Sequence, residues 1–479
     1  MNIREVLHIV GALLMWAAVS MVPPAVLGFT EGMAAPWILS VSVTATVGGA
    51  LWFLTPREVS INRREGIAVV GLGWISVVVA GALPFIFTGT APTVAGAIFE
   101  SVSGFTTTGA TIFAVIEDLP RSVMLWRSIS HWLGGMGIIV LGVAVLPLIG
   151  MGGAQLFRAE VPGIATDRLK PRVATTARLL WGVYALLTAT AAVTYLALGM
   201  SLFDAVNHAM SALATGGFST RTASLAAFRP AIQWVTIVFM LFAGTNFTLH
   251  YRFLTGRWNS FFGDAEWRWY AGVALVASVT VFVALGLSTG NWAFRDSAFN
   301  VVSIISTTGF ATADFGAWPD FTQVLLLSLM FVGAMGGSTG GGLKMARAVV
   351  VLKHATSEVR KVLHPRALFV TKLGRSPIRS DILANVLAFL ALYVVTHGVG
   401  SLLIAALGHD LVTSVSAALA AMSSIGPGLG GVGPASNYGQ LGASSHVILS
   451  ILMLLGRLEF YTLLVLFIPG TWDRWGGDR

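Results

Sequence analysis

Threonine, serine and glycine recur together at four places in a chain that is otherwise largely apolar. The copies read TTTGAT at 106–111, ATGGFST at 214–220, STTGFAT at 306–312 and SIGPGLG at 424–430. Each offers hydroxyl and carbonyl oxygens beside a glycine, which adopts backbone angles closed to residues with a side chain. Rings of such oxygens can replace the hydration shell of a bare monovalent cation. The residue types and their repetition therefore predict cation binding.

Each copy ends a short amphipathic stretch of about a dozen residues, whereas a spanning helix needs roughly 20 apolar residues. The stretches with their turns are VAGAIFESVSGFTTTGAT, LFDAVNHAMSALATGGFST, FRDSAFNVVSIISTTGFAT and LVTSVSAALAAMSSIGPGLG. Aligned on Gly109, Gly216, Gly309 and Gly426, they repeat about every hundred residues. Nine residues before the glycine stand Glu100, Asn207, Asn300 and, in the fourth copy, Ala417. We expect Glu100 to bind backbone amides near its turn.

The composition places the bulk of the chain in lipid. Of 479 residues, 55% are hydrophobic and only 10% are charged, with a mean hydropathy of +0.80, too little charge to cover a soluble protein. The chain has no cysteine, which excludes disulfides and thiolate metal sites. Ten spans are predicted, at about 6–28, 36–54, 66–88, 122–148, 177–199, 229–251, 267–288, 321–348, 381–405 and 444–469.

Basic residues lie mostly on one side of this ten-span arrangement. They follow the second, fourth, sixth and eighth spans and include both termini, at Arg4, Arg474 and Arg479, while the other side keeps Arg121, Arg221, Arg229 and Arg295. The crowded side is therefore predicted to be cytoplasmic, with both termini. The net charge of +8 is thus a topology signal and not a nucleic-acid-binding surface. The first apolar run is long and contains Pro23-Pro24, so we interpret it as a retained helix and not a signal peptide.

The predicted fold is an all-α membrane protein with four pseudo-symmetric span–pore helix–span repeats around one pore, preceded by two extra transmembrane helices. The predicted divisions are 1–60 for the two leading helices and 61–150, 151–262, 263–355 and 356–479 for the repeats. Unpaired backbone is tolerated at membrane depth only where it lines a protein-walled path. A single Thr-Gly copy would more often mediate helix packing, but four copies in equivalent positions favour a selectivity filter.

Twelve residues make up the predicted filter, three from each repeat. They are Thr107, Thr108 and Gly109; Ala214, Thr215 and Gly216; Thr307, Thr308 and Gly309; and Ser424, Ile425 and Gly426.

The eighth predicted span is interrupted by GAMGGSTGGGLK at 333–344, where continuous helix is disfavoured by about 1 kcal/mol per glycine. Broken helix at this depth usually lines a cavity, although a glycine face for close helix packing remains the alternative. A phosphate loop is excluded because Leu343 separates Lys344 from the glycines and no strand precedes. Arg457 lies within the last span and is expected to face a path or a partner, with Glu459 on another face of that helix.

The combination of these four motifs resembles the membrane subunits of the Trk/Ktr/HKT superfamily of potassium uptake systems, and the two leading spans make it more similar to the Trk type. The resemblance covers nearly the whole chain. It implies potassium bound by the backbone carbonyls of Thr108, Thr215, Thr308 and Ile425, and no organic cofactor. The fourth copy departs from the pattern, with Ile425 in place of threonine and Pro427 after the glycine.

The resemblance also implies a gate and partners. The gate would be the loop residues Gly336, Gly337, Ser338, Thr339, Gly340 and Gly341 together with Arg457, which would form a barrier to cations. The membrane part would be a homodimer in the bacterial inner membrane, bound to a cytosolic RCK-type nucleotide-binding ring subunit. The basic segment 353–379 is a candidate docking surface for that subunit, although positive-inside topology explains its charge equally well.

Three other functions compete with potassium uptake. A sodium-permeable relative is disfavoured because serine at the first-repeat glycine marks many sodium-permeable members, and this chain has Gly109. The potassium-binding subunit of a P-type pump shares the filter design but usually belongs to longer chains. A membrane-embedded transferase would need convergent acid, base or metal groups at one membrane face, and the sequence offers only isolated carboxylates such as Glu117, Asp118 and Asp314.

Overall fold

The computed structural model describes residues 2–55, 63–144, 169–367, 369–374 and 376–468. Predictions that fall on Arg57, Arg158, Arg168, Arg474 and Arg479, and on the end of the fourth predicted span, lie outside the described residues. The described part is helical, apart from one hairpin of two-residue strands, β1 (Lys372–Leu373) and β2 (Ser376–Pro377). The predicted all-α class is confirmed.

Three helices, which form the two predicted leading spans, precede the repeats. Helix α1 (Ile3–Ser20) continues into α2 (Val22–Thr30), and α3 (Ala34–Phe53) packs back against α1. The contact depends on glycine. A methyl group built on Gly11 would lie 2.8 Å from the carbonyl oxygen of Gly48, and one on Gly48 would lie 3.0 Å from that of Gly11. Close backbone approach between small residues is a usual way for membrane helices to associate.

Four helix triplets follow, each made of a long helix, a short helix and a returning helix. They are α4 (Arg63–Phe87), α5 (Val94–Phe105) and α6 (Arg121–Ala144); α9 (Leu169–Ala197), α10 (Leu202–Leu213) and α11 (Pro230–Ala243); α14 (Ala265–Thr289), α15 (Phe294–Ile305) and α16 (Asp320–Val332); and α18 (Ser380–Ala406), α19 (Leu411–Ser423) and α20 (Gly442–Arg457).

Smaller elements connect or follow the triplets. They are α12 (Phe247–Leu254), α13 (Ser260–Gly263), α17 (Met345–Leu363) and α21 (Tyr461–Leu464), with the 3₁₀ turns η1 (Ser224–Ala227), η2 (Phe315–Ala317), η3 (Gly430–Val432), η4 (Tyr438–Leu441) and η5 (Val465–Phe467).

The short helices α5, α10, α15 and α19 end in the four filter turns, and all but α15 begin at a side-chain cap. Thr93, Ser201 and Asp410 accept the first free backbone N–H groups of α5, α10 and α19, as N-cap residues do. Most residues of the four helices are buried. Because each helix ends at its own turn, the partly negative C-terminal end of the helix dipole lies next to that turn.

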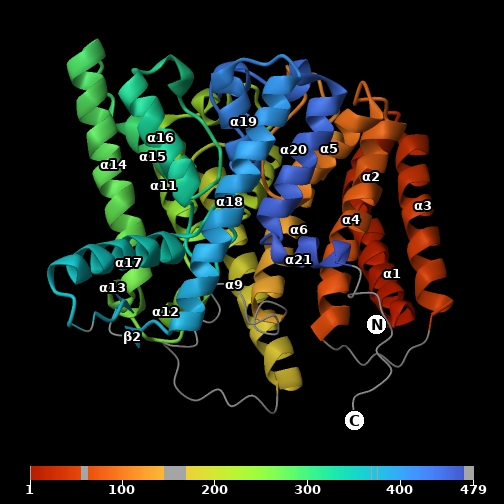
Figure 1. Ribbon diagram of the computed structural model, residues 1–479. Helices are drawn as coiled ribbons and strands as arrows, with labels where there is room; N and C mark the ends of the chain where they lie inside the picture. Colours follow the sequence, from red (N-terminus) through yellow and green to blue (C-terminus); the bar gives the residue numbers. More distant parts are fainter. Residues whose placement is uncertain (1, 56–62, 145–168, 368, 375, 469–479) are drawn as a thin grey trace, which may run out of the picture.

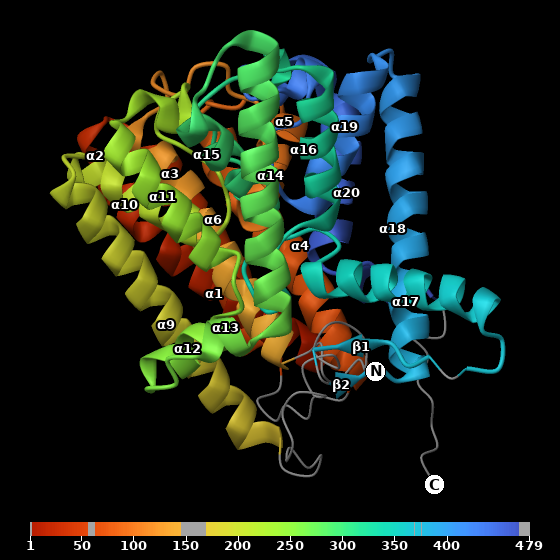
Figure 2. The ribbon, with the colours of Figure 1, turned by 90° about the vertical axis from the view of Figure 1, so that its left-hand side faces the viewer.

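Long helices run side by side, with the short α5, α15 and α19 in the upper half of the molecule (Figure 1). Helix α17 instead lies crosswise to them in both views (Figures 1 and 2). It is found near the end that also holds α12, α13 and the start of α1. The buried core surrounds the short helices, and a smaller apolar cluster joins α1 and α4 to the segment after α20.

Three predicted spans differ from the structure. Seven described helices are long and apolar enough to cross a membrane, or eight if a bent pair counts as one. That pair is α11 and α12, which meet at 101°, so the predicted span 229–251 is not straight; Asn246 caps α12 after the break. The predicted span 321–348 divides into α16 and the crosswise α17. The last span ends at Arg457, which therefore terminates α20 and does not lie in its middle.

Candidate ion-conduction site

The four turns share one backbone conformation. Thr107, Thr215, Thr307 and Ser424 all have positive φ angles between 52° and 60°, which cost a residue with a side chain about 1–2 kcal/mol each. Two residues later, Gly109, Gly217, Gly309 and Gly426 have φ angles between 79° and 94°. A conformation that is unfavourable at each position recurs in all four repeats, so the surrounding structure must impose it.

The turns also contact one another in cyclic order. A methyl group built on Gly109 would lie 2.0 Å from the carbonyl oxygen of Gly216, and one on Gly217 would lie 2.3 Å from that of Thr308. The corresponding distances are 1.8 Å from Gly309 to Ile425 and 2.6 Å from Gly426 to Thr108. Each glycine therefore lies against the carbonyl of the next repeat, and the four segments close into a ring.

This ring corrects the predicted register of the second repeat by one residue. Gly217, and not Gly216, has the backbone angle and the contacts of Gly109, so the carbonyl ring consists of Thr108, Gly216, Thr308 and Ile425, with Gly216 in place of the predicted Thr215. Ala214 is the αR residue that ends α10, as Thr106 ends α5. The second copy has two adjacent glycines, and aligning on the first of them produced the shift.

The same shift applies to the polar position within the short helices. His208, and not Asn207, corresponds to Glu100. The Nε2 atom of His208 lies 2.8 Å from the hydroxyl of Ser219, eleven residues later, just as the Thr111 hydroxyl donates to Glu100 over the same separation. Glu100 also accepts the backbone N–H of Ile112 at 3.0 Å, which confirms its expected role as an acceptor for a backbone amide.

The carbonyl oxygens of the ring are available to a ligand. Within the described residues, no protein donor lies within hydrogen-bond distance of the carbonyls of Thr108, Gly216, Thr308 or Ile425. The buried hydroxyls of Thr107 and Ser424 likewise have no protein partner. Buried polar groups without partners are rare in folded proteins. Four free carbonyls around one ring can coordinate a dehydrated monovalent cation.

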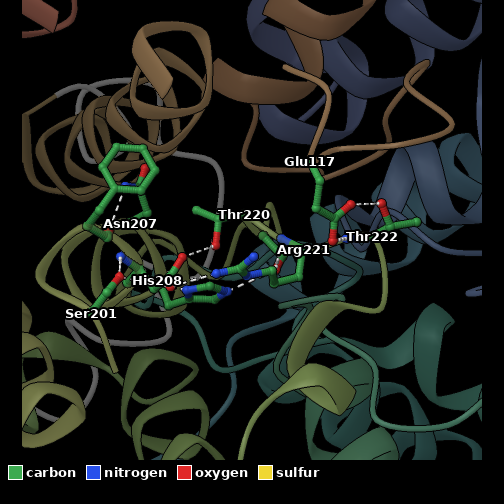
Figure 3. Close-up of polar contacts among 10 residues, drawn as sticks. Glu117, Ser201, Asn207, His208, Thr220, Arg221 and Thr222 are labelled. Atoms are coloured by element: carbon green, nitrogen blue, oxygen red, sulfur yellow. Dashed lines mark hydrogen bonds and ion pairs between the residues drawn. The ribbon is translucent and has the colours of Figure 1, made fainter. Parts of the chain in front are cut away.

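Polar contacts also join the loops after the first two turns (Figure 3). The carboxylate of Glu117 accepts the backbone N–H of Thr222 at 3.0 Å and the Thr222 hydroxyl. Burial alone would raise the pKa of Glu117, but these hydrogen bonds and the charge of Arg221 lower it overall. Asp204 accepts from Ser201, Thr220 and Arg221. The Glu117 carboxylate is thus ionised at neutral pH and ties the first loop to the second.

The glycine-rich segment 333–344 lies directly against the inner ends of the turns. Gly341 N–H donates to the Thr307 hydroxyl at 2.8 Å, and the Thr339 hydroxyl lies 3.0 Å from the carbonyl oxygen of Leu213, the last residue of α10. A methyl group on Gly341 would lie 2.2 Å from the carbonyl oxygen of Ser423. The segment therefore contacts the second, third and fourth repeats at the ring.

Arg457 completes this layer from α20. Its Nη1 donates to the Thr339 carbonyl at 2.7 Å, and its Nη2 lies 3.3 Å from the carbonyl of Gly134 on α6. The side chain is buried, and within the described residues no carboxylate lies within 4.0 Å of its guanidinium nitrogens. Its partners are backbone carbonyls, so its positive charge is not cancelled by a neighbouring anion. The predicted gate residues are therefore brought together beneath the ring.

Glu459, two residues after Arg457, serves a different contact, as its predicted position on another face implied. It forms an ion pair with Arg347 on α17 at 2.7 Å, and the Arg347 guanidinium carbon lies 4.0 Å from the ring centre of Phe389. Glu459 and Phe460 both have positive φ. The end of α20 is thereby tied to the crosswise helix that follows the glycine-rich segment.

Four contributors to the site were missed by the sequence interpretation. Arg127 pairs with Glu100 at 2.8 Å, His131 lies behind Gly216, Glu266 holds the glycine-rich segment, and the Tyr438 hydroxyl donates to the Gly426 carbonyl at 2.6 Å. Arg127 and His131 could have been found, because both lie inside a predicted span and the argument applied to Arg457 applies to them equally. No sequence signal identifies the other two.

A membrane-spanning all-α fold with a closed ring of free carbonyls defines a protein that conducts cations. The chain belongs to the TrkH family, described as cation transport proteins, whose profile matches residues 37–473. It is 39% identical to the Trk system potassium uptake protein TrkH of Halomonas elongata, covering 99% of this chain and all of that protein. It is 38% identical to the protein of that name from Escherichia coli, covering 98% and 100%.

A solved structure shares the fold. The crystal structure of the potassium transporter TrkH from Vibrio parahaemolyticus superposes with a TM-score of 0.91 at 36% sequence identity, covering 99% of this chain and all of that chain.

We expect Glu266 to control the order of the glycine-rich segment. Its Oε1 accepts N–H groups near both ends of the segment, from Gly336 at 2.8 Å and from Ala346 at 3.0 Å. Leaving a buried backbone N–H without its acceptor costs about 1–3 kcal/mol. Glu266→Ala should therefore speed amide hydrogen exchange at these two positions by one to two orders of magnitude. Glu266→Gln is the matched control, because its amide oxygen still accepts. Equal exchange in wild type and Glu266→Ala would contradict this role.

Proposed function

We propose that this protein takes up potassium across the inner membrane of a bacterium, down the electrochemical gradient of the ion. The observation that carries the proposal is the closed ring of free carbonyls from Thr108, Gly216, Thr308 and Ile425, without protein donors among the described residues. The names of the relatives, potassium uptake proteins and a potassium transporter, support the same ion. Potassium is then the transported ligand, and no organic cofactor takes part.

The proposed filter keeps the predicted residues of the first, third and fourth repeats. In the second repeat it consists of Thr215, Gly216 and Gly217, and Ala214 precedes this segment at the end of α10. The proposed division into two leading helices and four repeats, at 60, 150, 262 and 355, gives each repeat one filter segment. Gly109 in the first repeat supports potassium over a sodium-permeable relative. Transferase chemistry has no support, because the family is one of cation transport proteins.

Gating and assembly extend this proposal. The segment 336–341 and Arg457 would obstruct the path beneath the ring, and the ion pair between Arg347 and Glu459 would connect this obstruction to α17. The basic residues of 353–379 are the proposed docking surface for a cytosolic nucleotide-binding ring subunit, and α17 holds the first of them. A homodimeric membrane part with cytoplasmic termini completes the proposed arrangement.

The direct test is growth of a bacterium that lacks its potassium uptake systems. The protein should restore growth at low potassium, and purified protein in liposomes should carry potassium in preference to sodium when the ions compete. Liposome flux that favours sodium, or no flux in either assay, would refute potassium uptake.

Gly109→Ser should weaken the discrimination against sodium, because any side chain at this position meets the Gly216 carbonyl of the next repeat. We expect the potassium-to-sodium flux ratio to fall on the order of tenfold, equivalent to ~1.4 kcal/mol. Gly217→Ser, at the corresponding position of the second repeat, should act alike. Gly290→Ser is the matched control, since Gly290 also has a positive φ but has no atoms near its added Cβ. An unchanged ratio in both filter variants would exclude these glycines from selectivity.

Arg457→Gln should raise potassium flux, most visibly without a cytosolic partner. A fixed positive charge repels a cation at roughly 6 Å by about 3 kcal/mol when the effective dielectric constant is about 20, which sets an upper bound on the order of a hundredfold in rate. The measurement is flux per folded protein in liposomes, with folding checked by size-exclusion chromatography. Arg268→Gln serves as the control, because it removes the charge of an exposed arginine. A lower yield with unchanged or reduced flux per molecule would make Arg457 a structural residue only.

A further inference from the structure

Arg127 is a buried cation in the first third of α6 that contacts two neighbouring filter repeats. It is 1% exposed, and its Nε donates to Glu100 on α5 at 2.8 Å. Its Nη1 lies 3.3 Å from the carbonyl oxygen of Ser219, two residues after the second filter glycine. One guanidinium thus binds the first repeat through a carboxylate and the second through a backbone carbonyl.

An aromatic contact strengthens the link to the second repeat. The guanidinium carbon of Arg127 lies 3.9 Å from the ring centre of Phe218, the residue directly after Gly217. One helical turn later on α6, His131 stacks on the same ring at 4.0 Å and 12°. The His131 Nδ1 also lies 3.1 Å from the hydroxyl of Ser211 on α10. Two side chains of α6 therefore hold Phe218, and the first repeat supplies the wall behind the second filter segment.

Glu100 extends the link into the first filter segment. Its two carboxylate oxygens accept from the Thr111 hydroxyl and the Ile112 backbone N–H, both at 3.0 Å. These residues directly follow Gly109 and Ala110. The chain of contacts therefore runs from the first segment through Glu100 and Arg127 to Phe218 and the second. Because Glu100 and Arg127 neutralise each other, the pair can fix geometry without placing a net charge behind the ring.

Two other junctions of the ring use neutral hydrogen bonds. The second and third repeats are joined by Leu225 N–H donating to the Ala311 carbonyl at 3.1 Å. The fourth and first are joined by Tyr438 N–H donating to the Thr111 carbonyl at 2.8 Å. A planar guanidinium with several fixed donors constrains its partners more tightly than a single neutral bond.

We propose that Arg127 is a specificity-determining positioning residue, which fixes the spacing between the Thr108 and Gly216 carbonyls through Glu100 and Phe218. The proposal rests on the proposed function in that these carbonyls select the ion. Loss of Arg127 then relaxes one side of the ring, so that the smaller sodium ion is coordinated more easily, while the path itself stays intact.

The test compares potassium and sodium flux of purified variants in liposomes, per folded protein. Arg127→Gln should lower the potassium-to-sodium ratio by roughly twofold to thirtyfold, the range that coupling through packed contacts spans, with less effect on total cation flux. Arg127→Lys keeps the charge but loses the planar fork, so it should also lose selectivity. Arg295→Gln is the matched control, since Arg295 lies on the third short helix, is partly exposed and pairs only with the adjacent Asp296 among described carboxylates.

The outcomes separate the two proposals. Wild-type protein without potassium preference overturns the proposed function itself. If the wild type is selective and folded Arg127→Gln has the same potassium-to-sodium ratio, the positioning role is overturned. If Arg127→Lys keeps the wild-type ratio, only charge compensation matters, and the positioning role is overturned as well. If neither Arg127 variant folds, Phe218→Leu decides, because it removes the stacked ring and leaves the ion pair in place. Reduced selectivity there supports the proposal, and an unchanged ratio refutes it.

Discussion

A backbone carbonyl that is left free to bind an ion, as the proposed filter requires, forms no hydrogen bond within the protein, and this constraint shapes the rest of the molecule. The Thr108, Gly216, Thr308 and Ile425 carbonyls are free among the described residues, and each follows a residue in the left-handed region. Neither feature is favourable by itself. Both persist because a buried short helix ends just before each turn and the neighbouring glycine lies against each carbonyl. A serine or threonine side chain in place of Gly109, Gly217, Gly309 or Gly426 would separate the segments. Glycine is therefore required by close approach as well as by its φ angle.

The position of the glycine-rich segment beneath the ring follows from the same surroundings. The short helices end with free carbonyls at their C-terminal ends, and the glycine-rich segment supplies polar partners there, with the Thr339 hydroxyl near Leu213 and Arg457 bonded back to the Thr339 carbonyl. The segment can reach this place because its glycines leave room, as Gly340 and Gly341 show at the third and fourth repeats. It is held by Glu266 near both ends. A few polar anchors on an otherwise glycine-rich chain suit the proposed gate, which has to be ordered in one state and displaced in another.

Much of the fold was predictable because repetition and hydropathy are properties of the sequence alone. The four short helices, their turns and the interruption at 333–344 were all predicted from residue pattern. The bend at Asn246 was missed, although an N-cap residue after Gly244 is a recognisable signal. The end of α20 could not be predicted, since Glu459 and Phe460 adopt positive φ without glycine. The second repeat shows a different limit. Gly216 and Gly217 are equivalent in sequence, and only contacts with Gly109 and Thr308 distinguish them.

The ring combines uniform coordination with unequal supports. All four segments of the proposed filter have nearly the same backbone, because local angles decide where a carbonyl points. The contacts behind them differ. Between the first two repeats, Arg127 and His131 of the first contact the Phe218 ring of the second. A backbone hydrogen bond joins the second and third repeats, and a tyrosine joins the fourth and first. Repeats in a single chain can diverge in this way, whereas identical subunits cannot. Ile425 illustrates the result, since coordination by a carbonyl needs no hydroxyl. The fourth segment keeps its place in the ring through backbone geometry and the Tyr438 hydroxyl on Gly426, although its side chains no longer match the others.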